Sequence, residues 1–291
     1  MEHGAWGMGH GACSMEHGAE GGKEGKREGE RVRGRWRDRG MFKIKFYSMT
    51  ENLNRENKES RPLQKMFDEV PDRYDLMNRL LTFRFDERWR KMAARECVKG
   101  NPSKILDLCT GTGDMVIQIA ILANRKTGIF GLDYSPAMLS LAQKKSSKKG
   151  FDQIKFIKGD AAALPFENES IDVIGIAFAF RNLTYKNPDH EKFLKEIHRV
   201  LSKNGRFIIV ETSQPGSKIM RYLFYFYLNI FVAGIGGYLS GHKNAYKYLA
   251  ASARNFYSPV EVSDMLSEAG FREVQYNQLF GGIAGITVGI K

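Results

Sequence analysis

Cysteine is scarce in this 291-residue chain: Cys13, Cys97 and Cys109 are far apart and odd in number. Their spacing fits neither a disulfide framework nor the cysteine pairs of a structural metal site. We therefore expect a protein of the reducing cytoplasm, with no metal centre. Cys109 lies in a glycine-rich loop, but no histidine partner can be assigned to it. We interpret it as a small buried side chain rather than a nucleophile.

Long apolar runs are also missing. The N-terminus has no apolar segment of the kind that a secretory signal requires. The uncharged run Tyr222–Leu239 is slightly shorter than the roughly 20 residues that span a bilayer, and Asn229 and three glycines interrupt it. We interpret this run as a buried or interfacial segment, and a membrane span is the alternative.

Acidic residues are outnumbered. The 45 Lys and Arg against 33 Asp and Glu give a formal net charge of +12 at pH 7, spread along the whole chain. Nucleic acid and an anionic membrane surface are both partners for such a charge. A solvated basic surface without a specific partner explains the charge equally well. The net charge alone leaves these three interpretations open.

Residues 1–48 differ in composition from the rest of the chain. They are rich in Gly, Glu, Arg and His, and MEHGA occurs in them twice. Such a segment cannot bury enough apolar surface to offset the entropy of ordering it, so we expect a disordered tail. Its basic stretch Arg31–Gly40 is a candidate contact for RNA or lipid, although an inert tail is the preferred interpretation. Residues 49–291 are expected to form one domain.

Strands and helices alternate through this domain. Helical spacing covers residues 65–83 and 86–97, and repeated strand–helix units follow. The predicted strands are 104–108, 128–133, 154–160, 171–180, 206–211, 272–280 and 285–291, and the predicted helices between them are 114–124, 135–149, 189–201 and 258–270. Such repeats predict a Rossmann-like α/β fold, with a mainly parallel sheet and helices on both faces. Ligands of such folds bind at the carboxyl ends of the strands.

One loop carries the strongest chemical motif. It reads Asp107-Leu-Cys-Thr-Gly111-Thr112-Gly113-Asp114 and lies between a predicted strand and a predicted helix. Glycines there let the backbone approach a ligand closely. The N-terminus of the following helix presents free N–H groups to a carboxylate. The loop is therefore a candidate cofactor site.

Two further aspartates support a nucleotide-like cofactor. Asp133 ends the next strand, where a carboxylate can bind both ribose hydroxyls. Asp160 ends the third strand, where it suits an adenine amino group. A dinucleotide fingerprint needs glycine at position 116, which is Val116, and Asp114 would repel a pyrophosphate. S-adenosylmethionine has no phosphate, and its cationic groups tolerate Asp107 and Asp114. The aspartates therefore favour S-adenosylmethionine.

Several segments resemble, in order and spacing, the ubiquinone/menaquinone biosynthesis C-methyltransferase family. They are KILDLCTGTGD, GLDYSPAML, GDAAALPFENESIDVI, AFAFRNLTY and EIHRVLSKNGRF, with the more specific RYDLMNRLLTFRFDERWRK, FRN and FGGIAGITVGIK. The resemblance covers about residues 66–291. It implies a seven-stranded class I methyltransferase fold. It also implies transfer of a methyl group to a ring carbon of a demethylated quinol with an isoprenoid tail, demethylmenaquinone being the preferred acceptor.

The same resemblance implies roles for individual residues. By position, the cofactor contacts are Thr112, Asp133, Asp160, Ala161 and Ala177, and the acceptor contacts are Tyr74, Arg181 and Asn182. Ala177 stands where a Ser is common in the family. Arg181 is expected to stabilise the phenolate form of the quinol, Asn182 to orient its ring, and Tyr74 to close the pocket.

Residues 213–255 lie between the fifth strand and the last helix and contain many Tyr, Phe and Gly residues. An isoprenoid tail keeps its quinol in the bilayer, so the enzyme has to reach the membrane. We predict that this segment is an aromatic lid at the membrane surface, with Lys218, Arg221, Lys243 and Lys247 as basic flanks. A helical cap packed on the domain, or a homodimer contact, is the alternative.

Two other functions stay open. Thr82 and Arg84 stand where the family usually has Ser and Gly, and ETSQPGS replaces a more typical LEFSKP-like stretch. These differences allow a class I methyltransferase with another small-molecule or lipid acceptor. A nucleic-acid-binding protein with a regulatory cofactor site is the third hypothesis. Only the basic stretch Arg31–Arg39 with Trp36 favours it, and we expect no nucleic-acid partner.

Overall fold

The computed structural model describes residue 79, residues 81–240 and residues 243–291. They all belong to the compact unit Glu56–Lys291. The predicted tail at 1–48, most of the predicted helix at 65–83 and Tyr74 lie outside the described residues.

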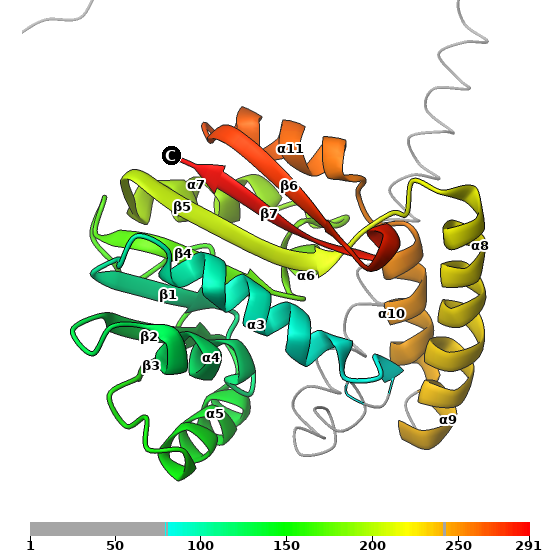
Figure 1. The fold of residues 1–291 in the computed structure, drawn as a ribbon, viewed down its shortest axis with the longest axis horizontal. Helices are drawn as coiled ribbons and strands as arrows, with labels where there is room; N and C mark the ends of the chain where they lie inside the picture. Colours follow the sequence, from blue (N-terminus) through cyan, green and yellow to red (C-terminus); the bar gives the residue numbers. More distant parts are fainter. Residues whose placement is uncertain (1–78, 80, 241–242) are drawn as a thin grey trace, which may run out of the picture. The chain divides into compact units, whose positions relative to one another are not determined.

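A seven-stranded sheet forms the centre of the fold (Figure 1). Its strand order is β3-β2-β1-β4-β5-β7-β6. The strands are β1 (Lys104–Leu108), β2 (Gly128–Asp133), β3 (Lys155–Lys158), β4 (Ile171–Ala177), β5 (Leu201–Thr212), β6 (Arg272–Leu279) and β7 (Ala284–Ile290). The first five strands are parallel, and β7 runs antiparallel to both β5 and β6. The predicted mainly parallel Rossmann-like sheet is confirmed.

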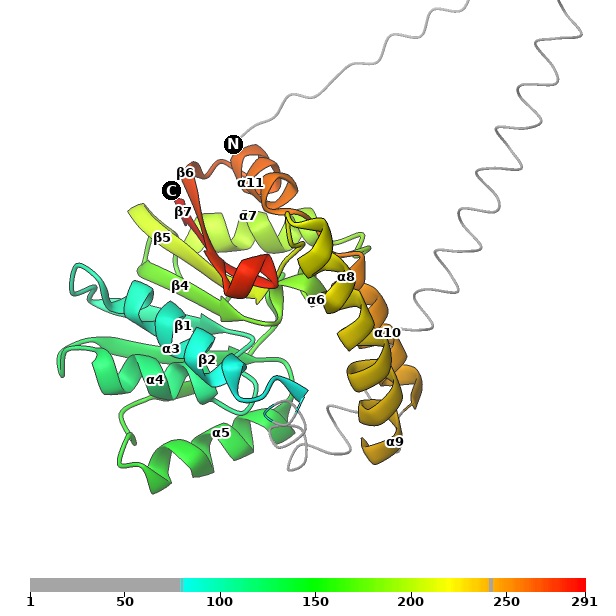
Figure 2. The same cartoon turned by 45° about the vertical axis from the view of Figure 1, so that its right-hand side comes forward.

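Helices cover both faces of the sheet (Figures 1 and 2). One face carries α3 (Phe85–Val98), α4 (Asp114–Leu122) and α5 (Pro136–Lys148), and the other carries α6 (Phe180–Thr184), α7 (His190–Val200) and α11 (Pro259–Glu268). Successive side chains of a strand point to opposite faces. Ile105 of β1 accordingly packs in the core with α3 and α4, whereas Leu106 and Leu108 pack in the core with α7 and α11. Burial on both faces explains why these strands are nearly continuous apolar runs.

Two strand boundaries differ from the prediction. The predicted strand 171–180 ends at Ala177, because Phe178 has a left-handed backbone with φ 57° and turns the chain into α6. The predicted strand 206–211 begins earlier, at Leu201, and an irregularity separates its pair with Ile171 from the regular register that starts at Arg206. The early end of β4 matters for function, because it places Phe178 at the carboxyl edge of the sheet.

The predicted insertion 213–255 is helical. It contains α8 (Lys218–Tyr227), the π-helix η1 (Leu228–Gly236), α9 (Gly237–Ser240) and α10 (Lys243–Arg254). Phe224 and Leu228 pack against Ala250 and Ala253 of α10. The continuous helix Lys218–Gly236 is long and apolar enough to cross a membrane, and 22% of it is buried within the protein. The insertion therefore has a small apolar core of its own.

Arg206 fastens α3 to the sheet. From β5 its guanidinium donates to the backbone oxygen of Glu96 at 3.0 Å and also to those of Cys97 and Lys99. The last carbonyls of a helix have no donor within the helix. Arg206 supplies donors for them, and α3 is thereby held over β4 and β5.

Replacement of Arg206 by Met should lower the free energy of unfolding by about 1.5–3 kcal/mol, the usual contribution of hydrogen bonds to a charged group. Urea denaturation followed by circular dichroism measures the change. Arg95→Met is the matched control, because Arg95 is an exposed arginine in the last turn of the same helix. Equal losses in the two variants would show that Arg206 does not fasten α3.

Candidate active site

The loop after β1 turns sharply before α4 begins. Cys109, Gly111 and Gly113 have φ values of 54°, 54° and 85°. A Cβ atom on Gly113 would lie 2.9 Å from Cβ of Ala142 in α5, so only glycine fits there. Gly113 is also the N-cap of α4, and no side chain caps the helix. The amides of Asp114 and Met115 are therefore available to a ligand, whereas the Val116 amide acts on the Asp107 carboxyl group.

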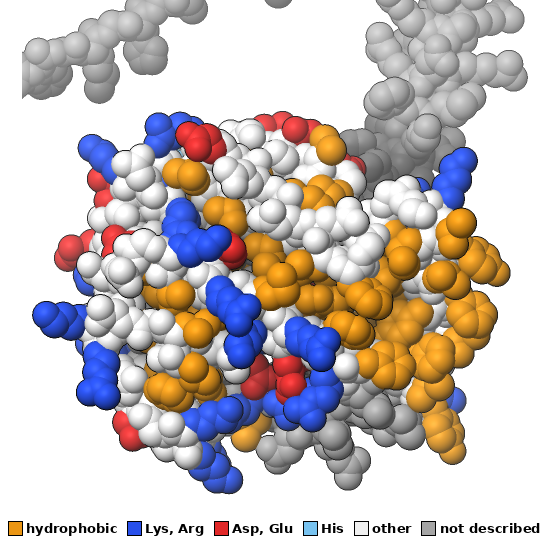
Figure 3. Space-filling model, in the orientation of Figure 1, with side chains coloured by type: hydrophobic (Ala, Val, Ile, Leu, Met, Phe, Trp, Pro, Cys, Tyr) orange, Lys and Arg blue, Asp and Glu red, His pale blue; other side chains and the backbone are white. Residues whose placement is uncertain are grey.

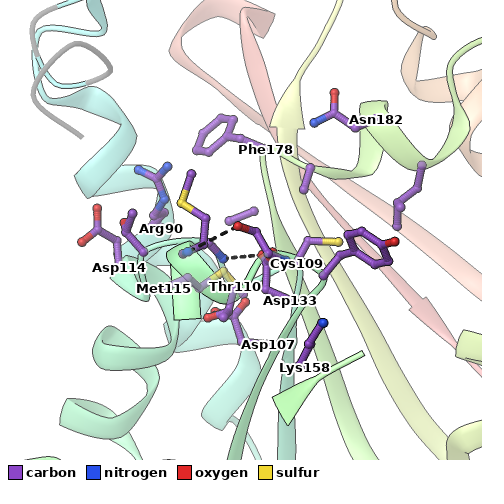
Figure 4. Close-up of a pocket in the computed structure, with 18 of the residues that line it drawn as sticks. Arg90, Asp107, Cys109, Thr110, Asp114, Met115, Asp133, Lys158, Phe178 and Asn182 are labelled. Carbon is purple, nitrogen blue, oxygen red and sulfur yellow. Dashed lines mark hydrogen bonds between the residues drawn. The ribbon is translucent and has the colours of Figure 1, made fainter. Parts of the chain in front are cut away.

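Asp133, at the end of β2, connects this loop with the start of α5. Its Oδ2 accepts a hydrogen bond from Gly111 N at 2.8 Å, and its Oδ1 accepts one from Ser135 N at 2.9 Å (Figure 4). Burial raises the pKa of Asp133, and these backbone donors partly oppose the rise. The carboxylate holds the loops after β1 and β2 together at the edge of the cavity.

Asp107, in β1, is a buried carboxyl group with an unused acceptor. Its Oδ2 accepts from the Thr110 hydroxyl at 2.6 Å. Its buried Oδ1 has no hydrogen-bond partner among the described residues. Burial raises the pKa of Asp107 to about 7, although Thr110 and the charge of Arg90 oppose the rise. A buried acceptor without a partner costs free energy, and a cationic donor would remove that cost.

Asp114, in contrast, is already paired. Lys145 donates to Asp114 Oδ1 at 2.7 Å and to the Thr112 hydroxyl at 3.0 Å, and Arg79 lies 3.6 Å from Asp114 Oδ2. Burial tends to raise the pKa of Asp114, but Lys145, Arg90 and Arg79 outweigh it and lower the pKa. Of the two loop aspartates, Asp107 is therefore the one whose carboxylate is open to a cationic ligand.

These groups surround a cavity of about 400 Å³ at the carboxyl ends of β1, β2 and β4. Six predicted site residues line it: Asp107, Gly111, Thr112, Asp133, Ala177 and Asn182. Figure 4 shows Asp107, Thr110 and Asp133 on one side of the cavity and Phe178 and Asn182 on the other. The structure thus brings together most of the predicted cofactor contacts and one predicted acceptor contact.

Three other predicted cofactor residues do not line the cavity. Gly113 lies behind it as the N-cap of α4. Asp160 is exposed, accepts a hydrogen bond from Ala162 N at 2.9 Å, and acts electrostatically on the cavity residue Cys109. Ala161 is buried in the apolar core. The contacts of Asp160 and Ala161 with the cofactor stay predictions.

Arg181 lies in a buried polar cluster next to the cavity. Its Nη1 is 3.6 Å from Glu211 Oε1 and donates to the Thr212 hydroxyl at 2.9 Å. Glu211 also accepts the backbone N–H groups of Arg181 and Thr212. The buried Nε of Arg181 has no hydrogen-bond acceptor in the part of the chain that the structure describes. Arg181 is thus a buried and oriented cation.

Sequence reasoning missed Arg90 and Phe178. Arg90 lines the cavity from α3, forms an ion pair with the buried Asp86, and lies 5.0 Å from the ring centroid of Phe178. Trp89 packs on the same ring, with the two centroids 6.2 Å apart. The i,i+4 spacing of Asp86 and Arg90 indicates an ion pair, but no sequence pattern shows that this helix face borders the cavity.

The fold and the cavity together define the class of protein. A glycine loop and a buried carboxylate at β1, with a second carboxylate at the end of β2, are the features expected for S-adenosylmethionine. Solved methyltransferases share this fold. A possible histamine N-methyltransferase from Thermotoga maritima has a TM-score of 0.53 at 21% identity, covering 79% of this chain and 99% of that one. A putative S-adenosylmethionine-dependent methyltransferase from Methanococcus maripaludis has a TM-score of 0.53 at 18% identity, covering 77% and 94%.

Sequence comparison identifies the family. Residues 54–291 match the model of the ubiE/COQ5 methyltransferase family, and the chain belongs to this family. It is 42% identical to a demethylmenaquinone methyltransferase of Thermotoga maritima, covering 77% of this chain and 94% of that protein. It is 39% identical to the Thermus thermophilus protein of the same name, and the match covers 77% of this chain and 99% of that protein. A ubiquinone/menaquinone biosynthesis C-methyltransferase, UbiE, of Geotalea uraniireducens is 36% identical, over 79% and 96%. The protein is an S-adenosylmethionine-dependent methyltransferase.

The raised pKa of Asp107 predicts how cofactor affinity depends on pH. We expect the ionised carboxylate of Asp107 to bind the cofactor's ammonium group. Affinity for the cofactor should then fall toward tenfold per pH unit below about pH 7. Asp107→Asn should bind weakly at pH 8 and show little dependence on pH. Isothermal titration calorimetry between pH 5.5 and 8.5 measures both, with the exposed Asp264→Asn as the matched control.

The stability of the ligand-free protein provides a second measurement on the same residue. The folded carboxyl group retains its proton between pH 3.8, its ordinary pKa, and about 7, whereas the unfolded group has lost it. The contribution of Asp107 to stability therefore decreases as pH rises through this range. Asp107→Asn should remove that decrease. The same pH dependence in wild type and variant would contradict the raised pKa.

Proposed function

We propose that this enzyme methylates a ring carbon of a demethylated isoprenoid quinol, with demethylmenaquinol as the preferred acceptor. The observation that carries the proposal is the outer wall of the cavity, where Phe178, Ala179 and Leu183 present apolar surface beside the single amide of Asn182. Such a wall suits a flat aromatic ring with few polar groups. The names of relatives that match over nearly their full length support this acceptor.

The charged groups of the cavity suit the methionine part of the cofactor. We assign its ammonium to the unused Oδ1 of Asp107, its carboxylate to Arg90 and the first amides of α4, and its ribose hydroxyls to Asp133. Thr112 and Ala177 lie along the same cavity. When bound there, S-adenosylmethionine supplies an electrophilic methyl group.

The acceptor carbon becomes nucleophilic when the neighbouring hydroxyl ionises. A phenolic hydroxyl has a pKa near ~10, so only about one molecule in a thousand is ionised at pH 7. In this proposal Arg181 stabilises the phenolate, either directly or through a water molecule. Its buried Nε–H, which has no acceptor among the described residues, supports this role, and Glu211 and Thr212 keep the guanidinium in place. Asn182 orients the ring, and Tyr74 closes the pocket.

The substrate's tail determines where the enzyme works. An isoprenoid chain gains about 0.8 kcal/mol per CH₂ buried in the bilayer, so the quinol stays in the membrane. We therefore propose a cytoplasmic enzyme that associates peripherally with the membrane, with residues 213–255 as the lid over the acceptor. The long apolar helix Lys218–Gly236, of which only 22% is buried, supports this arrangement. A homodimer through the same segment is the competing arrangement.

Transfer of labelled methyl groups tests the function. The full chain is incubated with labelled S-adenosylmethionine and vesicles that contain reduced demethylmenaquinone. Label should appear in menaquinone, and vesicles with oxidised demethylmenaquinone should give none, because only the quinol can ionise. Bound cofactor without labelled menaquinone would contradict the proposed acceptor while leaving the methyltransferase fold unaffected. Demethylated benzoquinols are the next acceptors to test.

Arg181→Lys tests the proposed catalytic residue. Lysine keeps the charge but loses the planar group that binds Glu211 and Thr212 simultaneously. We expect kcat to fall roughly 10- to 100-fold, equivalent to about 1.4–2.7 kcal/mol of transition-state stabilisation, with unchanged affinity for S-adenosylmethionine. The matched control is Arg199→Lys, since Arg199 is held by Glu196 away from the cavity. Normal kcat in Arg181→Lys would exclude a role that depends on the planar guanidinium of Arg181.

A further inference from the structure

A second hollow lies beside the cofactor cavity and is strongly basic. It has a volume of about 400 Å³, and its lining includes six Lys or Arg side chains against two acidic ones. Both acidic residues are already paired: Glu87 binds Arg79 at 2.8 Å and Arg84 at 3.0 Å, and Asp114 binds Lys145 at 2.7 Å. The remaining positive charge, which includes Arg88 and Lys91 of α3, suits an anionic ligand such as a phosphate group.

The outer face of α8 and η1 is apolar. Its residues are spaced at three and four positions along one side of the helix, and the exposed fractions are 75% for Ile219, 71% for Tyr222, 53% for Leu223, 50% for Phe226 and 44% for Ile230. The opposite side, with Phe224 and Leu228, packs on α10. A surface helix of a globular protein usually has a polar outer face. The helix formed by α8 and η1 instead has apolar side chains on its solvent-facing side as well as on its buried side.

Aromatic contacts connect the hollow with α8. The Arg88 guanidinium lies 5.7 Å from the Phe85 ring centroid, and the Phe85 ring lies 4.7 Å from that of Phe280, which is itself 54% exposed. The next residue, Gly281, packs against Met220 of α8. Figure 3 shows the resulting hydrophobic area running across this face to α8, with Lys and Arg side chains beside it.

We infer that this face docks on a bilayer of anionic phospholipid. The outer face of α8, together with the exposed Phe280 and Phe83, enters the acyl chains, and the hollow at Arg84, Arg88 and Lys91 binds the phosphate of a lipid headgroup. The complementarity of charge argues for an anionic membrane as the occupant. The inference rests on the proposed function, in which the acceptor is dissolved in the membrane.

The position of the hollow makes docking useful for catalysis. Arg90 and Asp114 line both the hollow and the cofactor cavity. A lipid headgroup bound in the hollow therefore places the mouth of the cavity next to the membrane surface. A quinol ring can then pass from the bilayer to the cofactor over a short distance, with its tail remaining among lipids or along α8.

Vesicle binding tests the inference without any quinone or cofactor. A negative result therefore contradicts membrane docking and leaves the proposed acceptor untouched. The probes are vesicles of phosphatidylcholine alone and vesicles that also contain phosphatidylglycerol, and sedimentation measures the bound protein. Wild type should bind the anionic vesicles more tightly. Arg88→Gln with Lys91→Gln should weaken that binding by roughly 30-fold, because each cation near such a surface contributes a roughly fivefold factor.

The control pair is Arg125→Gln with Lys126→Gln. These two exposed residues lie in the turn before β2, at the amino ends of the strands, whereas the cofactor cavity lies at the carboxyl ends. Their replacement removes the same net charge. It should change binding by less than threefold. If the two double variants weakened vesicle binding equally, only the net charge of the protein would matter. If wild type bound both vesicle types equally, the hollow would not be a headgroup site. Either result overturns the inference.

The apolar part of the surface is tested by Leu223→Ser with Phe226→Ser, both exposed, so the fold should be retained. This variant should bind anionic vesicles only at low salt, because charge attraction without insertion is screened. Sedimentation equilibrium of the free protein completes the test. A wild-type dimer that this variant converts to monomer, with vesicle binding unchanged, would assign the face to a second copy of the chain and overturn the inference.

Discussion

The rest of the structure depends on the strand order at β1, where the sheet continues through β2 and β3 on one side and through β4 and β5 on the other. β1 pairs with β2 on one side and with β4 on the other, so the loops after β1 and β4 diverge and leave space between them. The cavity occupies this space, with the glycine loop on one side and Phe178 and Asn182 on the other. The hydrogen bonds that Asp133 accepts from Gly111 and Ser135 hold the loop after β1 to the loop after β2, and so fix the position of the glycine loop at one side of this space.

The balance of charge around the cavity determines which ligand charges it favours. Several ionisable groups lie close together, yet most are paired: Asp114 with Lys145, Asp86 with Arg90, and Asp133 with backbone donors. Asp107 is different, since one of its buried oxygens has no partner among the described residues and burial raises its pKa to about 7. An anionic ligand group at that point would increase the repulsion, whereas an ammonium group would relieve it. The charge at Asp107 therefore disfavours a phosphate group at this point of the cavity and favours an ammonium group.

The sequence was sufficient to predict the fold and the residues on the loops that follow the strands. The glycines, Asp107 and Asp133 lie at strand ends, and strand ends of a parallel sheet necessarily meet at one edge. It was not sufficient for Arg90 and Phe178. Arg90 lies on a helix that reaches the cavity only because α3 packs over β4 and β5, and Phe178 was predicted as part of a strand. Local patterns do not encode such tertiary placement. The partner of Arg181, Glu211, comes from a neighbouring strand and was missed for the same reason.

The helical insertion presents a physical problem that the catalytic domain does not. A helix with apolar residues on both sides leaves apolar surface in contact with water unless both sides are covered. One side of α8 packs on α10, and the other leaves Ile219, Tyr222 and Phe226 at least half exposed. Full burial of an exposed side chain of this size contributes about 1.5–3 kcal/mol. Since these three are between half and three quarters exposed, a corresponding part of that contribution is still to be gained. That gain favours a covered state of the enzyme over a free one. The basic hollow adjoins this apolar surface. A partner that fits both the hollow and the surface has to be apolar inside and anionic at its boundary. A bilayer of anionic phospholipid has these properties, whereas the apolar face of another protein has only the first.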